Sequence, residues 1–167
     1  LANAVIATYA STSIMIDRDV VVLAAFLHDL GKTKELDWSC GFSYTEDGNL
    51  VGHIVRGAIM LEDKARDAEM AGAPTLAEGS LRHLQHLVLS HHERPEYGAA
   101  KEPQTHEAHI LCMVDKLDAK AREIGKSKGI KGHAATGVEM SGPIMDRIGI
   151  PAAHQEPILF VIEHHLA

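Results

Sequence analysis

Aromatic residues are scarce in this sequence, at 4% of 167 residues, although 46% of the residues are hydrophobic. A β-sandwich or β-barrel would normally contain more Tyr, Phe, Trp and Thr, because these side chains pack well on pleated strands. Ala and Leu abound instead, together with Ile and Val, and this balance favours helices. The composition therefore predicts an all-α fold, and the length suffices for the hydrophobic core of one domain.

An excess of basic residues is also absent, since the formal net charge is −7. A protein that holds nucleic acid mainly by its own charge is normally basic, so broad, non-specific nucleic-acid binding by this chain alone is disfavoured. A nucleic-acid substrate stays compatible with the acidic chain if bound metal ions neutralise phosphates locally. Histidine, by contrast, is abundant, with 12 residues.

Cysteine is represented only by Cys40 and Cys112, and no CxxC pair occurs. This excludes a disulfide framework and a zinc knuckle, and it fits the reducing cytoplasm, which is the location we predict. The longest apolar run, residues 20–27, is far too short to span a bilayer, so we expect no membrane insertion.

The pattern of apolar residues and helix-capping signals predicts a bundle of about six or seven helices in a single domain, residues 1–167. Asp17 or Asp19 can cap the second helix, and Gly31 occupies the position expected for a glycine just after its end. We expect a long loop over 32–48, another over 125–137, and no strand. The expected helices cover residues 2–15, 17–30, about 50–67, 76–91, 105–124, 138–148 and 155–166.

Several of these helices have an apolar stripe at steps of three and four residues, which predicts the side that faces the core. The second helix is apolar on every face, so it should be central and buried. Thr75 and Glu78 form a capping-box pattern before a helix that begins with Leu76. The predicted stripes are Leu50, Ile54, Ala58, Leu61 and Ala65 in the third helix, and Ile110, Val114, Leu117, Ala121 and Ile124 in the fifth.

Ionisable residues at four places along this pattern point to a metal site. The pair His28-Asp29 closes the apolar second helix, where burial is costly unless something compensates the charge. A divalent cation compensates a carboxylate and takes neutral imidazoles as further ligands. Each place alone fits a structural pair or a solvated side chain equally well, but the series on successive helices is much harder to obtain by chance. The other three places are His53, His91-His92 and Asp115.

These residues also carry a family resemblance. The segment His28-Asp29-Leu30-Gly31-Lys32 resembles the HDxGK signature of the HD-domain metal-dependent phosphohydrolases, and the later motifs of that superfamily match Gly52-His53-Ile54, His91-His92-Glu93 and Asp115 to Ala119. Residues 20–122 are more narrowly similar to the HD domain of the bacterial 3′→5′ exoribonucleases that carry an OB-fold before it. The resemblance implies the all-α HD-domain bundle.

The resemblance also implies a role for each residue. His28, Asp29 and Asp115 would hold one metal ion, Asp29 would bridge to a second, and the remaining ligands of that second ion would be His53, His91 and His92. Lys32 would face the substrate phosphate as a point charge, beside Asp29 at the catalytic centre. A water between the ions would attack phosphorus. The cofactor is then one or two divalent ions, for which the ligand types suit Mn, Fe, Ni, Co or Zn better than Mg.

Two further residues are candidates for substrate binding. Arg94 follows the histidine pair and could contact a phosphate, although a solvated arginine is the alternative. Asp118 lies one helical turn from Asp115 and could support the site or simply face solvent. We set aside four histidines that are rotated away from the ligand faces: His83, His86, His106 and His109.

The sequence departs from the family pattern because no histidine precedes His28, whereas the family has one metal-binding histidine on its first helix. Residues 1–6 read like the interior of a helix, so we expect this histidine to lie before Leu1; the alternative is a degenerate first site. No OB-fold is present in the sequence either. The leading hypothesis is phosphoester hydrolysis, in single-stranded RNA or a nucleotide. The alternatives are a nucleotidase or signalling-nucleotide phosphodiesterase, and a non-catalytic HD module that binds a ligand.

Overall fold

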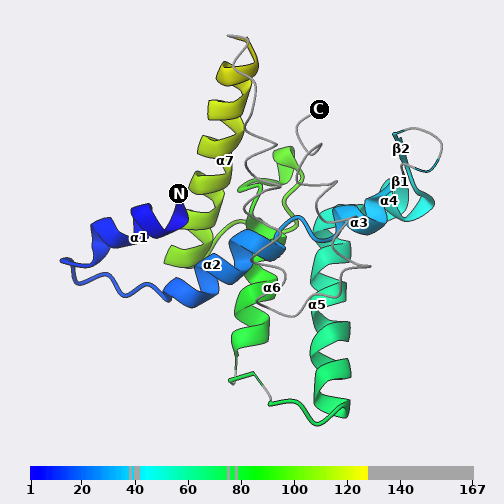
Figure 1. Ribbon diagram of the computed structural model, residues 1–167, viewed down its shortest axis with the longest axis horizontal. Coiled ribbons are helices and arrows are strands. Elements are labelled where there is room, and N and C mark those ends of the chain that lie inside the picture. The colour runs from blue at the N-terminus through cyan, green and yellow to red at the C-terminus, as the bar shows by residue number, and fades with distance from the viewer. Residues whose placement is uncertain (38, 40–41, 75, 78, 128–167) are drawn as a thin grey trace. The chain divides into compact units, whose positions relative to one another are not determined.

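The computed structural model describes residues 1–37, 39, 42–74, 76–77 and 79–127. The chain divides into two compact units, Leu1–Asp115 and Lys116–Ala167. The described part is mostly helical, which confirms the all-α prediction (Figure 1). The assignment of residues 1–167 to a single HD domain remains a prediction, as do the helices expected over 138–148 and 155–166, which lie outside the described residues.

Helix α1 (Ala2–Tyr9) is shorter than the helix predicted over 2–15, and none of its residues is buried. The reason lies in Thr12, whose hydroxyl donates a hydrogen bond to the carbonyl of Tyr9 at 2.8 Å and accepts one from the N–H of Ile14 at 3.2 Å. Such local side-chain bonds offer the backbone an alternative to the helical ladder. The prediction of a first helix over residues 2–15 was therefore wrong beyond Tyr9.

Helix α2 (Arg18–Leu27) begins at the predicted cap, with the Asp17 carboxylate accepting from the backbone N–H groups of Asp19 and Val20. Val21 and Ala24 are fully buried, but Leu23 is 41% exposed. The uniformly apolar composition of α2 predicted burial on every face, but the helix is buried on one side only.

Gly31 is not the left-handed glycine predicted to follow α2. Its φ is −60°, an ordinary right-handed value, and it starts the short helix α3 (Lys32–Glu35). A Cβ atom at Gly31 would lie 2.0 Å from the carbonyl oxygen of His53. Glycine is needed here because α3 approaches the start of α5 too closely for any side chain.

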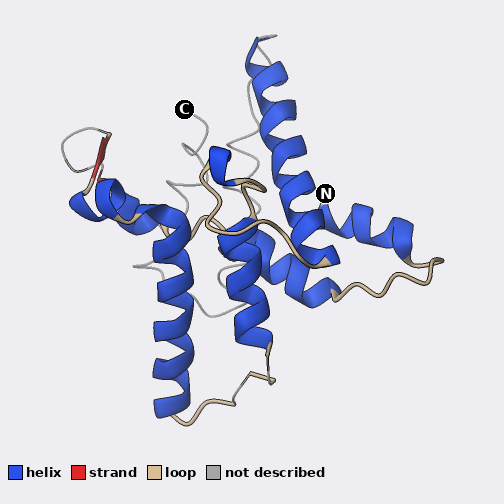
Figure 2. Cartoon of the chain, turned by 180° about the vertical axis from the view of Figure 1, so that it is seen from behind, coloured by secondary structure: helices blue, strands red, loops and turns tan. Residues whose placement is uncertain are grey.

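The segment predicted as a loop over 32–48 contains several short elements. Strands β1 (Leu36–Asp37) and β2 (Ser43–Tyr44) pair antiparallel, with Leu36 opposite Tyr44, and helix α4 (Glu46–Leu50) follows. Figure 2 shows this small strand pair, in red, beside helices that are otherwise joined by loops. The expectation of no strand was wrong, because strands of two residues are too short to carry a periodic pattern.

Helices α5 (Gly52–Met70) and α6 (Ser80–Ser90) lie side by side in both views (Figures 1 and 2). The Gln85 side chain of α6 donates to the carbonyl of Ala58 in α5 at 3.3 Å. The start of α6 is later than predicted, and Leu76 is 51% exposed outside it. The proposed capping box, Thr75 with Glu78, lies outside the described residues.

A short 3₁₀ helix, η1 (Pro95–Tyr97), leads to helix α7 (His106–Ser127), which begins in the first unit and continues into the second. Because α7 runs to Ser127, the loop predicted over 125–137 is wrong for residues 125–127, and the rest of that prediction lies outside the described residues. The core of the first unit is formed where α2, α6 and the first half of α7 meet, by Ala24, Leu84, Leu87, Ala108 and Leu111.

The predicted apolar stripes are correct in part. Ile54, Ala58 and Ile110 are buried, whereas Leu50 is 76% exposed. Leu50 belongs to α4, and Gly52, with φ of +75°, starts α5 in a new direction, so the helical spacing from Leu50 to Ile54 is broken. In the later part of α7 the predicted stripe is also wrong, since Leu117 and Ile124 are 54% and 47% exposed.

Within the described ranges, no helix combines the length and the apolarity needed to cross a bilayer.

Candidate metal centre

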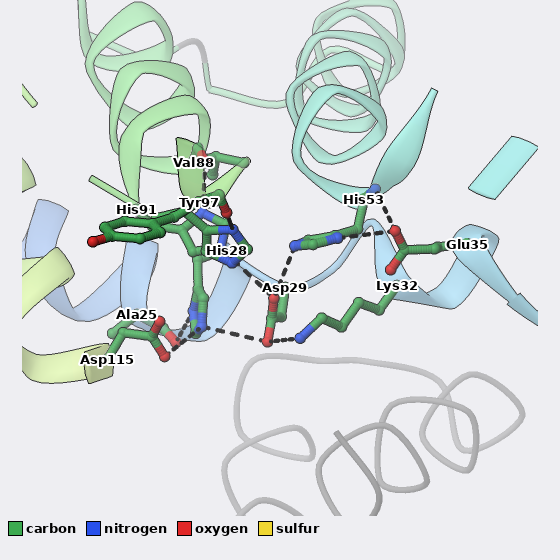
Figure 3. Close-up of polar contacts among 11 residues, drawn as sticks. Ala25, His28, Asp29, Lys32, Glu35, His53, Val88, His91, Tyr97 and Asp115 are labelled. Carbon is green, nitrogen blue, oxygen red and sulfur yellow. Dashed lines mark hydrogen bonds and ion pairs between the residues drawn. The ribbon is translucent and has the colours of Figure 1, made fainter. Parts of the chain in front are cut away.

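Three histidines and Asp29 from three different helical segments meet in the first unit (Figure 3), and His92 adds a fourth imidazole beside His91. His28 caps the end of α2, His53 lies in the first turn of α5, and His91 caps the end of α6. The ring centroids of His91 and His92 are 4.3 Å apart, those of His28 and His91 5.0 Å, and those of His53 and His92 5.3 Å. The residues that the sequence places on separate helices thus form one cluster.

Backbone carbonyls fix the orientation of three of these rings. A carbonyl can only accept, so each Nδ1 must carry a proton, and in the neutral imidazole Nε2 then carries the lone pair. The contacts are His28 Nδ1 to Ala25 O at 2.9 Å, His91 Nδ1 to Val88 O at 2.7 Å, and His92 Nδ1 to Tyr97 O at 2.9 Å. The hydrogen bonds therefore assign the same tautomer to all three imidazoles.

His53 is held by a carboxylate instead. Glu35 Oε1 lies 3.0 Å from His53 Nδ1 and accepts the backbone N–H of the same residue at 3.1 Å. Glu35 is buried, with 9% of its surface exposed. Sequence reasoning missed Glu35, because it lies in the segment read as a loop and no local pattern marks it as a partner of His53.

The Nε2 atoms of His28, His53 and His91 are buried, and each lacks a hydrogen-bond partner among the described residues. They surround the Asp29 carboxylate at 3.5, 3.7 and 3.8 Å, respectively. These distances are too long for hydrogen bonds. A lone pair and a carboxylate oxygen repel each other in a buried place unless a cation lies between them, so this donor set fits a divalent metal ion.

Two groups of ligand atoms are compact enough to hold an ion, with all atoms of a group within 4.8 Å of one another. One consists of His53, His91 and His92, and the other of His28, Asp29 and His91. Asp115 Oδ1 lies 3.6 Å from His28 Nε2, at the edge of the second group. All six predicted ligands therefore lie together, although His91 belongs to both groups rather than to one.

Burial and the surrounding charges keep these groups in the forms that a metal needs. Burial, reinforced by His28 and His92, lowers the pKa of His91 to about 3, so its imidazole is neutral. Burial opposes ionisation of Asp29, but His28 and Lys32 outweigh it and hold the pKa of Asp29 well below its ordinary value. Metal binding requires a neutral imidazole and an ionised carboxylate, and both are present near neutral pH.

His28 and Asp115 stabilise each other's charged forms. Burial lowers the pKa of His28, but Asp115 and Asp29 more than compensate, so the net pKa is raised. Burial likewise opposes ionisation of Asp115, and the contact with His28 nevertheless lowers its pKa. The field at this spot thus favours positive charge, which a proton or a metal cation can supply.

The predicted substrate-binding residues are placed differently. Lys32 Nζ forms an ion pair with Asp29 Oδ2 at 2.8 Å, and both side chains are 16% exposed. Arg94 is exposed just before η1. In the second unit, Asp118 Oδ2 accepts from Arg122 Nε at 2.7 Å. The substrate-binding roles of Arg94 and Asp118 remain predictions.

Comparison with known proteins identifies the family. The sequence model of the HD domain matches residues 1–120. This chain belongs to the HD domain family. Within the HD domain, the catalytic and metal-binding roles of individual residues remain predictions, whereas the resemblance that suggested the family is confirmed.

Curated relatives narrow the similarity further. This chain is 43% identical over 120 residues to the 3′-5′ exoribonuclease YhaM of Bacillus pumilus, and the match covers 72% of this chain and 35% of the relative. Its identity to the 3′-5′ exoribonuclease YhaM of Bacillus subtilis is 42% over 120 residues, with the same coverage. The protein of that name from Geobacillus sp. is 39% identical over 127 residues, or 76% of this chain and 36% of the relative.

The chain thus spans about a third of the length of these curated relatives. No solved structure matches it. Family and relatives together support the predicted class of protein, a metal-dependent phosphohydrolase.

Proposed function

We propose that this HD domain hydrolyses phosphodiester bonds with the help of one or two divalent metal ions, and that its substrate is single-stranded RNA, shortened from the 3′ end. The observation that carries the proposal is the ring of three buried Nε2 lone pairs around the Asp29 carboxylate. Such an arrangement has no stabilising role by itself, because it places hydrogen-bond acceptors against one another.

Asp29 would join the two metal sites. Its Oδ1 atom faces His53 and His91, and its Oδ2 atom faces His28, so the two oxygens serve different groups. When bound, the divalent ions would supply Lewis acidity and neutralise charge on the phosphate. Asp115 would complete the group on the side of His28.

Lys32 would bind the substrate phosphate beside Asp29. An ammonium group has three donors, and the ion pair with Asp29 uses one of them. The remaining donors can reach phosphate oxygens. The ion pair therefore holds Lys32 at the centre and leaves N–H donors available to the substrate. Lys32 would therefore position the phosphate next to the metal ligands.

RNA is favoured as the substrate by the names of the relatives and by Tyr97. The carbonyl of Tyr97 accepts from His92, while 61% of the residue's surface is exposed (Figure 3). An aromatic ring at the border of a metal site is suited to stacking on an unpaired base. The ions would be Mn, Fe, Ni, Co or Zn, given the mixture of imidazole and carboxylate ligands, and a cytoplasmic location fits this substrate.

The test compares three substrates after the chain has been treated with chelator and reloaded with each metal separately. We expect stepwise 3′ shortening of a 5′-labelled RNA oligonucleotide, hydrolysis of bis(p-nitrophenyl) phosphate, and no action on a nucleoside monophosphate. Asp29→Asn should abolish both activities, since it removes the shared carboxylate.

Other outcomes would redirect the assignment. Activity on the monophosphate but not on RNA would identify a nucleotidase. Metal binding without hydrolysis of any of the three substrates would support the non-catalytic module. Hydrolysis of bis(p-nitrophenyl) phosphate without action on RNA would retain the chemistry and overturn the substrate.

A further inference from the structure

The hydrogen bonds behind the imidazoles are not equivalent. His28, His91 and His92 each donate from Nδ1 to a neutral backbone carbonyl. Behind His53 stands a side-chain carboxylate, that of Glu35. Among the described members of the cluster, His53 is therefore the histidine whose supporting acceptor carries a negative charge.

Glu35 fixes His53 at two points. One oxygen, Oε1, receives both the ring N–H at 3.0 Å and the backbone N–H at 3.1 Å, which sets the rotation of the ring relative to the start of α5. The Glu35 side chain is only 11% exposed. With Nδ1 held in this way, Nε2 faces Asp29 at 3.7 Å (Figure 3).

The backbone around Glu35 is held in turn by α4. Its carbonyl accepts the N–H of Thr45 at 2.9 Å. Gly48 passes so close that a Cβ atom there would lie 2.3 Å from the same carbonyl oxygen. Helix α4 thus leaves Glu35 little freedom to move away from His53.

We infer that Glu35 is a positioning residue for His53, and that it selectively tightens the metal site formed by His53, His91 and His92. The inference rests on the proposed metal centre, but not on the choice of RNA as substrate. A carboxylate behind a ligand histidine fixes its tautomer and strengthens electron donation from the other nitrogen, and loss of such a partner typically weakens metal affinity about 10–100-fold. The site of His28, Asp29 and His91 has no such carboxylate behind its imidazoles, so it should be affected much less.

The test uses the whole chain and two variants, Glu35→Ala and Glu35→Gln. Zinc or manganese is titrated into chelator-treated protein in competition with a chromophoric chelator, and the two dissociation constants are measured. For Glu35→Ala we expect one constant to rise about 10–100-fold and the other to change less than about twofold. Glu35→Gln keeps an oxygen acceptor and loses only the charge, so it should recover part of the affinity.

A second readout needs no metal. The ¹⁵N shifts of the His53 ring in the metal-free chain report its tautomer, which should be the Nδ1–H form in the wild type and in Glu35→Gln, and a mixture in Glu35→Ala. The matched control is Glu62→Gln, because the Glu62 carboxylate also accepts a side-chain hydrogen bond, from Gln85 at 2.9 Å, whereas the hydrogen bonds and ion pairs of the described residues join it to no histidine of the cluster.

The outcomes separate this inference from the proposed function. If the wild type binds metal, but Glu35→Ala changes neither the dissociation constants nor the His53 tautomer, the inference alone is overturned. Equal weakening of both sites would also overturn it, since the role would then be general to the fold. If the wild type binds no metal at all, both the proposed function and the inference fail.

Discussion

Helix α6 carries histidines in its first two turns and at its C-terminal cap, and the two parts use them differently. In the first two turns, His86 Nε2 accepts the backbone N–H of Gln104 at 2.9 Å, and His83 Nε2 lies 3.1 Å from the Thr105 hydroxyl. At the far end, His91 Nδ1 is held by the Val88 carbonyl, while its Nε2 has no hydrogen-bond partner among the described residues.

The histidines differ in whether the Nε2 lone pair already accepts a hydrogen bond. The Nε2 lone pair of His86 is already occupied by an N–H donor, so it cannot bind an ion without breaking that bond. His83 also lies 3.5 Å from Glu107, whose other oxygen accepts the N–H of Asp17 at 2.8 Å and so ties the start of α2 to α7. One end of α6 therefore stabilises the fold, and the other end offers ligands.

The largest expected effect concerns His91, which belongs to both groups of ligand atoms. His91→Ala should lose both ions, and hydrolysis of bis(p-nitrophenyl) phosphate should fall by at least about 100-fold, since loss of even a supporting residue costs about 10–100-fold. Elemental analysis and the hydrolysis rate measure this. His86→Ala is the matched control and should retain its metal. Full metal occupancy in His91→Ala would contradict the different roles proposed for the histidines of α6.

His92 belongs to only one of the two groups. We therefore expect His92→Ala to lose one ion and keep the other, which elemental analysis per chain would show as a difference of one from the wild type. Loss of both ions, or of neither, would mean that the two groups do not act as separate sites.

The structural end of α6 should respond in the opposite way. Glu107 is 8% exposed, and its replacement leaves the Asp17 N–H and the His83 ring without their buried partner. Glu107→Ala should lower the free energy of unfolding by roughly 1–3 kcal/mol, with unchanged metal content per folded chain. Urea unfolding provides the measurement, and Glu102→Ala, at an exposed position, is the control. Loss of metal in folded Glu107→Ala would show that the two ends are not independent.

The smallest expected effect is at the cap of α2. Asp17→Ala removes the acceptor for the N–H groups of Asp19 and Val20 and should cost about 1 kcal/mol of unfolding free energy. Asp19→Ala, whose side chain is 91% exposed, should change the urea midpoint far less. Equal effects of the two variants would disprove the capping role of Asp17.

Much of the candidate site could be predicted from the sequence. The six proposed ligands occur in a characteristic order, and a buried His-Asp pair requires compensation wherever it occurs. Glu35 could not be predicted, because its partner His53 is 18 residues away and the two meet only through the close approach of α3 and α5. The ion pair between Lys32 and Asp29 is local, at three residues, yet sequence reasoning assigned Lys32 to catalysis and substrate binding without predicting this ion pair.

The fold, like the candidate site, could be predicted from the sequence only in part. Long periodic helices such as α5 were predicted, and so was the cap at Asp17. The burial of Leu50 and the turn at Gly31 were predicted wrongly, because a helical pattern does not reveal where one helix stops and another begins. Strands β1 and β2 were not predicted, because they are too short to show a periodic pattern.

The sequence by itself determined the helical class, the family and the identity of the proposed ligands, since composition, periodicity and motif order are properties of the chain alone. Only the tertiary structure decided that Glu35 stands behind His53, and that His83 and His86 serve the fold. The physical reason is that the hydrogen-bond partners of these three histidines come from other parts of the chain, 18 to 22 residues away. The use of a lone pair is therefore settled by packing rather than by spacing.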